Sequence, residues 1–287
     1  MELQNTVEQP PFYFKIAKWL QKNNIRGGYR LENIFRSLGL LDVNVIYSLG
    51  NSVSIKIPIS ILSYDLHFIN SYEHKSIEYL KIIISSYNCK TLLVDCGADI
   101  GLISAKLVAA SDKIDYVYSF EPNIKSYKIL EENQKLLPVK SKAINKAVAD
   151  FAGKAILMNP SFDSSDHAAF IVPDQNGVIN VMSIDDVKLP VYSCILIKVD
   201  VEGGELDVLH GASKTILTVK HFIIIFEAHY KQAKRAGLDP VDVIAYIKKL
   251  RPSRAVVVER THDEIDLKRP FFDQFPEGIY NICVHSE

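Results

Sequence analysis

The hydrophobic and polar positions from residue 91 onward alternate between two patterns. Short, nearly continuous apolar runs are typical of strands buried on both faces of a parallel sheet, and longer segments with helical spacing are typical of the helices that cover it. The apolar runs predict strands at 91–96, 114–120, 143–148, 194–200, 222–226, 254–259 and 279–284. The helical segments lie at 102–110, 125–137, 206–219 and 241–250. This order predicts a doubly wound α/β fold.

The connection between the last two predicted strands differs from the others. It contains no segment of clear helical period, whereas parallel neighbours are joined by a crossover that is usually a helix. We therefore expect a seven-stranded sheet whose last strand runs antiparallel.

Residues 1–90 follow another pattern and are interpreted as an N-terminal α/β extension, with the main domain at 91–287. Phe12 to Gln21 and Ile77 to Tyr87 have helical spacing. Asn51 to Ile59 alternates apolar and polar positions, as a half-buried strand does. We expect this extension to pack against the main domain.

A polar, turn-rich stretch at 159–186 interrupts the rhythm between the third and fourth predicted strands. It does not suit a crossover helix, and insertions beside the carboxyl ends of strands are often lids or substrate-binding elements. We therefore expect residues 159–180 to border a substrate pocket. Asp166 and His167 are its best candidates for polar contacts with the substrate.

Composition and charge limit the classes of binding partner that the protein is expected to have. Of the 287 residues 48% are hydrophobic, and 33 basic residues nearly balance 34 acidic ones, for a net charge of −1. Without a field of one sign, neither nucleic acid nor an anionic membrane surface is an expected partner. No apolar run approaches the roughly 20 residues that a membrane span needs.

The cysteines and the start of the chain bear on location. The four cysteines form no CxxC pair, which favours reduced thiols over a structural zinc site. The acidic, polar start at Met1–Glu8 lacks the basic and apolar regions of a signal peptide. Both observations favour a cytoplasmic protein.

The first candidate motif for chemistry lies where the first main-domain strand meets its helix, and it reads Asp95-Cys96-Gly97-Ala98-Asp99-Ile100-Gly101. Gly97 and Gly101 let the backbone approach a ligand closely, at the crevice where nucleotides bind in open α/β sheets. The turn is not the G-x-G-x-x-G of dinucleotide sites, and its acids would repel a pyrophosphate. It favours a ligand with a positive centre and no phosphate, such as S-adenosylmethionine.

The second motif, Phe120-Glu121-Pro122, ends the second strand. Glu121 follows the glycine turn at the spacing of an acid that accepts hydrogen bonds from both ribose hydroxyls. Pro122 ends the strand and starts the next helix. We assign both residues to the cofactor site, and we expect Asp150, after the third strand, near the adenine.

The third motif follows the fourth strand and reads Lys198-Val199-Asp200-Val201-Glu202-Gly203-Gly204-Glu205. Side chains alternate along a strand, so Lys198 and Asp200 share one side. A lysine within an apolar strand needs a carboxylate partner. We expect Asp200 in the cleft, near cofactor and reaction, and Glu202 and Glu205 near the substrate.

The fourth motif, Glu227-Ala228-His229, ends the fifth strand. Its carboxylate and imidazole are two residues apart, so they face the same cleft. Histidine can act as a general base near neutral pH. We expect Asp200, Glu227, His229 and Lys198 to form the catalytic group.

Jointly these motifs resemble those of the FkbM-type S-adenosylmethionine-dependent methyltransferases. That family shows an acid-x-Gly-Ala-Asn-x-Gly turn, a Phe-Glu-Pro, a Lys-x-Asp-x-Glu-Gly-x-Glu and an acid after the fifth strand. The likeness covers roughly 91–230 and extends to Ser183–Asp186 and His210–Ala212. The chain departs at Asp99, where Asn is usual, which keeps an acceptor and loses an amide donor.

The resemblance implies a class I, Rossmann-like methyltransferase fold with S-adenosylmethionine as cofactor. It also implies methyl transfer to oxygen, with a hydroxyl of a sugar, glycan or secondary metabolite as the acceptor. Two rival functions remain open: a nicotinamide-dependent oxidoreductase, disfavoured by the missing G-x-G-x-x-G, and a non-catalytic binding module on the same fold, disfavoured by the retained acids.

Two arrangements of the chemistry also remain open. In one, a carboxylate or His229 takes the hydroxyl proton directly. In the other, Asp200, Glu227 and His229 hold a divalent ion that lowers the pKa of the acceptor. The arrangement without metal is favoured, because Lys198 would repel a cation and histidine is a soft ligand for a hard ion.

Overall fold

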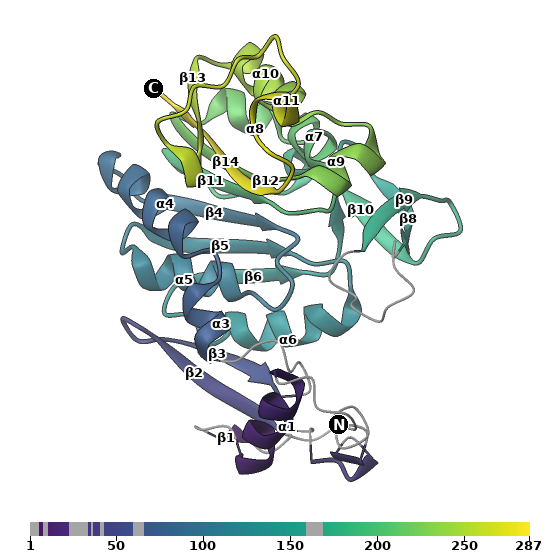
Figure 1. Ribbon diagram of the computed structural model, residues 1–287. Coiled ribbons are helices and arrows are strands. Elements are labelled where there is room, and N and C mark those ends of the chain that lie inside the picture. The colour runs from purple at the N-terminus through teal and green to yellow at the C-terminus, as the bar shows by residue number, and fades with distance from the viewer. Residues whose placement is uncertain are drawn as a thin grey trace.

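A seven-stranded sheet forms the centre of the computed structural model, which describes residues 6–7, 11–22, 34–35, 37–40, 43–59, 66–158 and 169–287. Its strand order is β13-β14-β12-β11-β4-β5-β6 (Figure 1). Only β14 runs antiparallel to its two neighbours; the remaining pairs are parallel. The strands are β4 (Thr91–Cys96), β5 (Ile114–Phe120), β6 (Lys140–Ile144), β11 (Cys194–Val199), β12 (His221–His229), β13 (Ser253–Val257) and β14 (Ile279–Ser286). The predicted fold class is confirmed.

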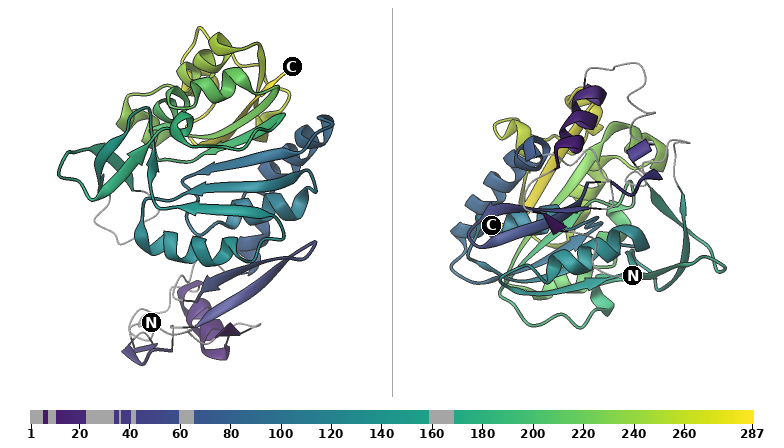
Figure 2. Two further views of the ribbon diagram at one scale, coloured as in Figure 1. Left: turned by 180° about the vertical axis from the view of Figure 1, so that it is seen from behind. Right: turned by 90° about the horizontal axis from the view of Figure 1, so that it is seen from below.

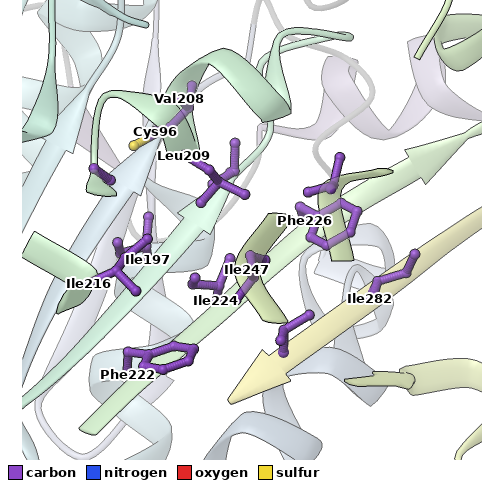
Figure 3. Packing of buried hydrophobic residues seen from close by; sticks show 14 of the residues in the cluster. Cys96, Ile197, Val208, Leu209, Ile216, Phe222, Ile224, Phe226, Ile247 and Ile282 are labelled. Atoms are coloured by element: carbon purple, nitrogen blue, oxygen red, sulfur yellow. The ribbon is translucent and has the colours of Figure 1, made fainter. Parts of the chain in front are cut away.

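Helices cover both faces of this sheet, because its strands carry apolar side chains on both sides. The helices of one face are α4 (His74–Ser86), α5 (Leu102–Ala110) and α6 (Ile124–Gln134). The helices of the other are α7 (Glu205–His210), α8 (Ser213–Thr218), α10 (Pro240–Leu250) and α11 (Phe271–Gln274). On this second face Phe222, Ile224 and Phe226 of β12 pack against Leu209 and Ile247 (Figure 3).

Two predicted elements differ from the structure. The helix predicted at 206–219 is two helices, because the chain turns at Gly211 and Ala212 between α7 and α8. The strand predicted at 143–148 is also divided, since β6 ends at Ile144 and β7 (Ala147–Val148) joins another sheet. In both cases a continuous apolar pattern hides a change of direction.

The segment that was expected to form an insertion contributes to a four-stranded sheet of order β7-β10-β8-β9. Its other strands are β8 (Gly153–Met158), β9 (Phe170–Pro173) and β10 (Ile179–Met182), and a short 3₁₀ helix (Ile184–Asp186) follows. This small sheet lies beside the carboxyl ends of the parallel strands (Figure 1, Figure 2). Asp166 and His167 lie outside the described residues.

The N-terminal region shares its core with the main sheet. It contains β1 (Thr6–Val7), α1 (Phe12–Lys22), β2 (Asn44–Gly50), β3 (Val53–Pro58) and α3 (Leu66–Ser71). The β2–β3 hairpin packs on α5 and α6. Its buried residues, such as Ile55 and Ile57, belong to the same apolar cluster as Leu93 and Val117 of the main sheet. The topology of the chain therefore changes near residue 90, but the hydrophobic core continues across it.

The chain closes with α9 (Tyr230–Ala236), directly after β12, and a 3₁₀ turn (Val258–Arg260) after β13. Among the described helices, none combines the length and the apolar character that crossing a bilayer requires.

Candidate active site

A cavity of about 640 Å³ opens at the carboxyl ends of the parallel strands. One part of its wall comes from the turns after β4 and β5, and another from the ends of β11 and β12 with α9. The hairpin of β8 and β9 and the segment around α3 complete it. The small sheet and the N-terminal region therefore both contribute to the space between the predicted motifs.

The turn after β4 is the tightest part of the cavity. Gly97 has a φ of +79°, and a Cβ there would lie 1.8 Å from the carbonyl oxygen of Asp200. The amides of Gly97 and Ala98 both donate to the Phe120 carbonyl at 3.0 Å. The amide of Asp200 donates to the Cys96 carbonyl, also at 3.0 Å. Only glycine allows the ends of three neighbouring strands to meet this closely.

Glu121 is the buried acid of the adjoining turn, with 8% of its surface exposed. Its Oε2 accepts the Asp99 amide and its Oε1 accepts the Asn123 amide, both at 2.8 Å. Burial raises the pKa of Glu121 to about 7, although these two hydrogen bonds oppose the rise. A carboxylate offers about four lone-pair sites, so two remain for a pair of vicinal hydroxyls in the cavity.

Lys198 has two carboxylate partners behind this turn. Its Nζ lies 3.4 Å from Asp95 Oδ1 and 3.2 Å from Asp200 Oδ2. Burial lowers the pKa of Lys198, but the charges of Asp200 and Asp95 outweigh it and hold the pKa well above its ordinary value. Lys198 is therefore a permanent cation in the floor of the cavity.

Asp95 is placed differently from the prediction that it contacts the cofactor. Its side chain is fully buried, and its Oδ2 accepts the Ser104 hydroxyl at 2.6 Å. It is not among the described residues that line the cavity. A carboxylate with these partners holds Lys198 in position, so Asp95 acts on the cavity through its neighbour.

The ends of β11 and β12 bring three carboxylates together, those of Asp200, Glu202 and Glu227. Burial, followed by the charges of Asp200 and Glu202, raises the pKa of Glu227 to about 8. Gln232 of α9 bridges two of them, because its Nε2 lies 2.5 Å from Glu202 Oε2 and 3.5 Å from Glu227 Oε1. The pattern of charged residues did not reveal Gln232.

His229 also lines the cavity, with its tautomer determined by the backbone. Its Nδ1 accepts the Lys231 amide at 3.1 Å, as the N-cap of α9. Burial lowers the pKa of His229, so the ring is neutral at neutral pH. A neutral ring that accepts at Nδ1 carries its proton on Nε2. In this geometry His229 is a hydrogen-bond donor to the cavity.

Three other predicted residues lie outside the wall that the described residues form. Glu205 is buried and accepts the Gly203 amide at 3.0 Å, and burial raises its pKa to about 7. Gly101 is the N-cap of α5, and a Cβ there would lie 2.8 Å from Leu130 Cδ1. Asp150 is exposed. Glu205 and Gly101 therefore shape the loops beneath the cavity, away from its surface.

The described residues do not bring Asp200, Glu227 and His229 close enough to share one ion. The single set of three whose ligand atoms lie within 4.8 Å of one another, within the described ranges, is Asp150, Asp207 and His210. Two members of that set are exposed acids. The metal arrangement considered from the sequence therefore stays a prediction, with ligand atoms that do not all lie within 4.8 Å of one another in this structure.

Several wall residues have no signal in the sequence pattern. They are Phe68, Tyr72, Phe151, Gln232 and Arg235, whereas Phe170 belongs to the stretch 159–180 that was expected to border a pocket. Arg235 of α9 lies over the ring of Phe170 in β9, with its guanidinium carbon 4.2 Å from the ring centroid, and also donates to the Glu202 carbonyl. These residues meet only because the tertiary fold joins segments that are distant in sequence.

The sheet order and the acid-and-glycine turns define a class I S-adenosylmethionine-dependent methyltransferase. Residues 95–253 match the model of the methyltransferase FkbM domain. The match covers more than half of this chain, so the chain belongs to the FkbM methyltransferase family. The nicotinamide alternative is therefore not supported.

Individual relatives are distant. The hexuronic acid methyltransferase AglP of Haloferax volcanii is 26% identical over 183 residues, which are 62% of this chain and 70% of that protein. An FkbM methyltransferase structure from Methylobacillus flagellatus KT has 20% identity and a TM-score of 0.44; the match covers 68% of this chain but 43% of that one. The M. jannaschii TYW2 structure with AdoMet has 15% identity and a TM-score of 0.42, covering 84% of each chain.

The residues present fit S-adenosylmethionine. Glu121 retains acceptor capacity for the ribose hydroxyls, and Gly97 leaves the turn free of a Cβ. No basic residue lies in the turn from Asp95 to Gly101, as a ligand without phosphates requires. When bound, this cofactor supplies a methyl group already activated by its positive sulfur.

Proposed function

We propose that this methyltransferase transfers the methyl group to a hydroxyl oxygen of a sugar, either free or within a glycan. Two observations support the proposal. The relative AglP acts on a hexuronic acid, as its name states. One end of the cavity is also lined by carboxylate and amide side chains, including those of Glu202, Glu227 and Gln232. Such groups form hydrogen bonds with sugar hydroxyls.

The single observation that carries the chemistry is the environment of Glu227. Methyl transfer to a hydroxyl forms a C–O bond and breaks the C–S bond, and the hydroxyl proton must move to a base. Burial, followed by the charges of Asp200 and Glu202, raises the pKa of Glu227 to about 8, which is closer to neutral pH than that of an ordinary carboxylate and suits a general base. We assign it the proton, so that the products are a methyl ether, S-adenosylhomocysteine and a protonated Glu227.

The neighbouring residues suit supporting tasks. Asp200 is paired with Lys198 at 3.2 Å, so its carboxylate already has a cation as partner. His229 presents an N–H to the cavity, so it suits donation to an acceptor oxygen. Glu121 and the turn from Gly97 to Asp99 would hold the ribose and the amino acid part of the cofactor.

Purified protein incubated with S-adenosylmethionine and a panel of glycosides tests the proposal. The panel contains methyl glucuronide, methyl galacturonide, methyl glucoside and, as a non-sugar comparison, catechol. The expected result is a product heavier by one CH₂ and an equal amount of S-adenosylhomocysteine. Methylation of catechol alone would contradict the sugar assignment. If the protein binds the cofactor tightly but methylates none of the acceptors, the result would favour a binding module.

The cellular setting is part of the same proposal. Cys89, Cys96, Cys194 and Cys283 are free thiols, and the last three are buried. Free thiols suit a reducing compartment, which supports work in the cytoplasm.

A further inference from the structure

Two aromatic residues from outside the matched methyltransferase domain line the cavity. Phe68 lies in α3, and Tyr72 follows that helix directly. Their rings stack with centroids 4.8 Å apart and planes inclined by 22°. The pair therefore offers the cavity one continuous apolar surface, although it belongs to the N-terminal region.

The turn that carries Tyr72 is fixed from several directions. Ile69 is fully buried. The Lys106 ammonium of α5 donates to the carbonyl of Ile69 at 2.9 Å and to that of Tyr72. Glu73 adopts a left-handed φ of 54°, which is costly for a residue with a side chain, and its Oε1 accepts the Asn281 amide at 3.1 Å. A turn held this firmly presents Tyr72 in one position.

Tyr72 lines the same cavity as Lys198, Asp200 and Glu227. Burial, followed by the charge of Asp200, raises the pKa of Tyr72 far above its usual value, and Lys198, Glu73 and Glu227 also act on it. The hydroxyl therefore keeps its proton at every working pH. A protonated hydroxyl beside carboxylates is a hydrogen-bond donor.

We propose that Phe68 and Tyr72 form the platform on which the acceptor ring binds. A pyranose ring packs its C–H face on the aromatic pair, and the Tyr72 hydroxyl donates to a ring substituent beside Glu227. This proposal rests on the proposed sugar O-methylation, and it specifies a cyclic acceptor with an apolar face. Lys106 is a positioning residue, because it acts on the acceptor only through the turn.

Saturation-transfer NMR with methyl β-glucuronide, on protein loaded with S-adenosylhomocysteine, tests the platform without turnover. The expected wild-type result is saturation of the C–H protons on one ring face. Phe68→Leu and Tyr72→Leu should weaken binding of this probe about tenfold or more, and Tyr72→Phe about three- to tenfold. Unchanged binding in all three variants would overturn the platform.

Kinetics with the same glycoside separates binding from folding. Tyr72→Phe and Lys106→Met should raise KM severalfold while kcat changes less. A fall in kcat alone for both variants would contradict a platform. Tyr79→Phe is the matched control, because Tyr79 lies on α4 near Cys283 and Arg254 and is not one of the cavity residues described; it should leave KM unchanged.

The failure of this inference differs from the failure of the proposed function. A wild-type protein that binds S-adenosylhomocysteine in calorimetry but none of the glycosides overturns the sugar assignment and the pyranose platform with it. A wild-type protein that binds and methylates the glycoside, with Tyr72 and Phe68 variants that do the same equally well, overturns only the platform.

Discussion

The two halves of the cavity are built in different ways. The half that we propose to hold the cofactor, the cofactor half, comes from two short segments, 97–99 and 120–123, joined by hydrogen bonds from the amides of the first to the Phe120 carbonyl and the Glu121 side chain. The half that we propose to bind the acceptor, the acceptor half, comes from the ends of β11 and β12, from α9, from the β8–β9 hairpin and from the turn after α3. One half is local and rigid, and the other is assembled from distant parts.

The two halves also differ in the hydrogen bonds that their buried glutamates accept. In the cofactor half, Glu121 has backbone amides on both oxygens. In the acceptor half, Glu227 accepts one long contact from Gln232, at 3.5 Å, and lies near Asp200 and Glu202. The first acid is held as part of the turn. The second is suited to exchange a proton.

The largest expected effect is on turnover in Glu227→Gln. An amide cannot accept the hydroxyl proton, so kcat should fall by roughly 10²–10⁴, the usual contribution of a general base. Binding of S-adenosylhomocysteine, measured by calorimetry, should stay within a few-fold. In the wild type, kcat/KM for the acceptor should rise with pH through an apparent pKa at or below about 8, because the base must be ionised. Wild-type turnover in Glu227→Gln would show that another group accepts the hydroxyl proton.

The same contrast explains what the sequence could predict. Strands β4 and β5 and helix α5 have the predicted bounds, because each is a single apolar run closed by a turn residue. The cofactor motifs were visible for the same reason. Gln232, Arg235 and Tyr72 carry no local pattern, since only the tertiary fold brings them to one cavity. Asp95 and Glu205 look like ligand contacts in sequence, and burial alone shows that they hold the loops.

The second prediction concerns the junction between the halves. A Cβ at Gly97 would overlap the Asp200 carbonyl at 1.8 Å, whereas at Gly237 it would meet nothing within 4 Å. Both glycines have positive φ, +79° and +66°, so both changes to alanine carry backbone strain of about 1 kcal/mol. Gly97→Ala should destabilise by about 2–4 kcal/mol in urea unfolding. Gly237→Ala is the control, and equal losses in the two variants would contradict a close junction.

The third prediction tests the cofactor half. Glu121→Ala removes a charge-assisted hydrogen-bond acceptor worth roughly 1.5–3 kcal/mol. The Kd of S-adenosylhomocysteine should rise about tenfold or more in calorimetric titration. The exposed Glu264→Ala serves as the control and should change nothing. Unchanged affinity in Glu121→Ala would remove this acid from the ribose site.

The last prediction distinguishes two buried glutamates with the same raised pKa of about 7, Glu121 and Glu205. Burial raises the folded pKa of Glu205 above the ordinary 4.5, so the folded state binds its proton more tightly than the unfolded chain does. The stability that this proton contributes is complete below about pH 4.5 and is lost as the pH rises toward 7. The loss amounts to about 3 kcal/mol.

Glu205→Gln should therefore gain about 2–3 kcal/mol relative to the wild type between pH 5 and pH 8 in urea unfolding. The amide oxygen of the new side chain can still accept the Gly203 amide, which Glu205 now accepts at 3.0 Å. Because Glu205 is outside the described cavity wall, affinity for S-adenosylhomocysteine should stay unchanged, in contrast to Glu121→Ala. If Glu205→Gln and the wild type differ in stability by the same amount at pH 5 and at pH 8, the Glu205 proton does not contribute to folding stability. A loss of cofactor affinity in Glu205→Gln would show that Glu205 contributes to the cofactor site.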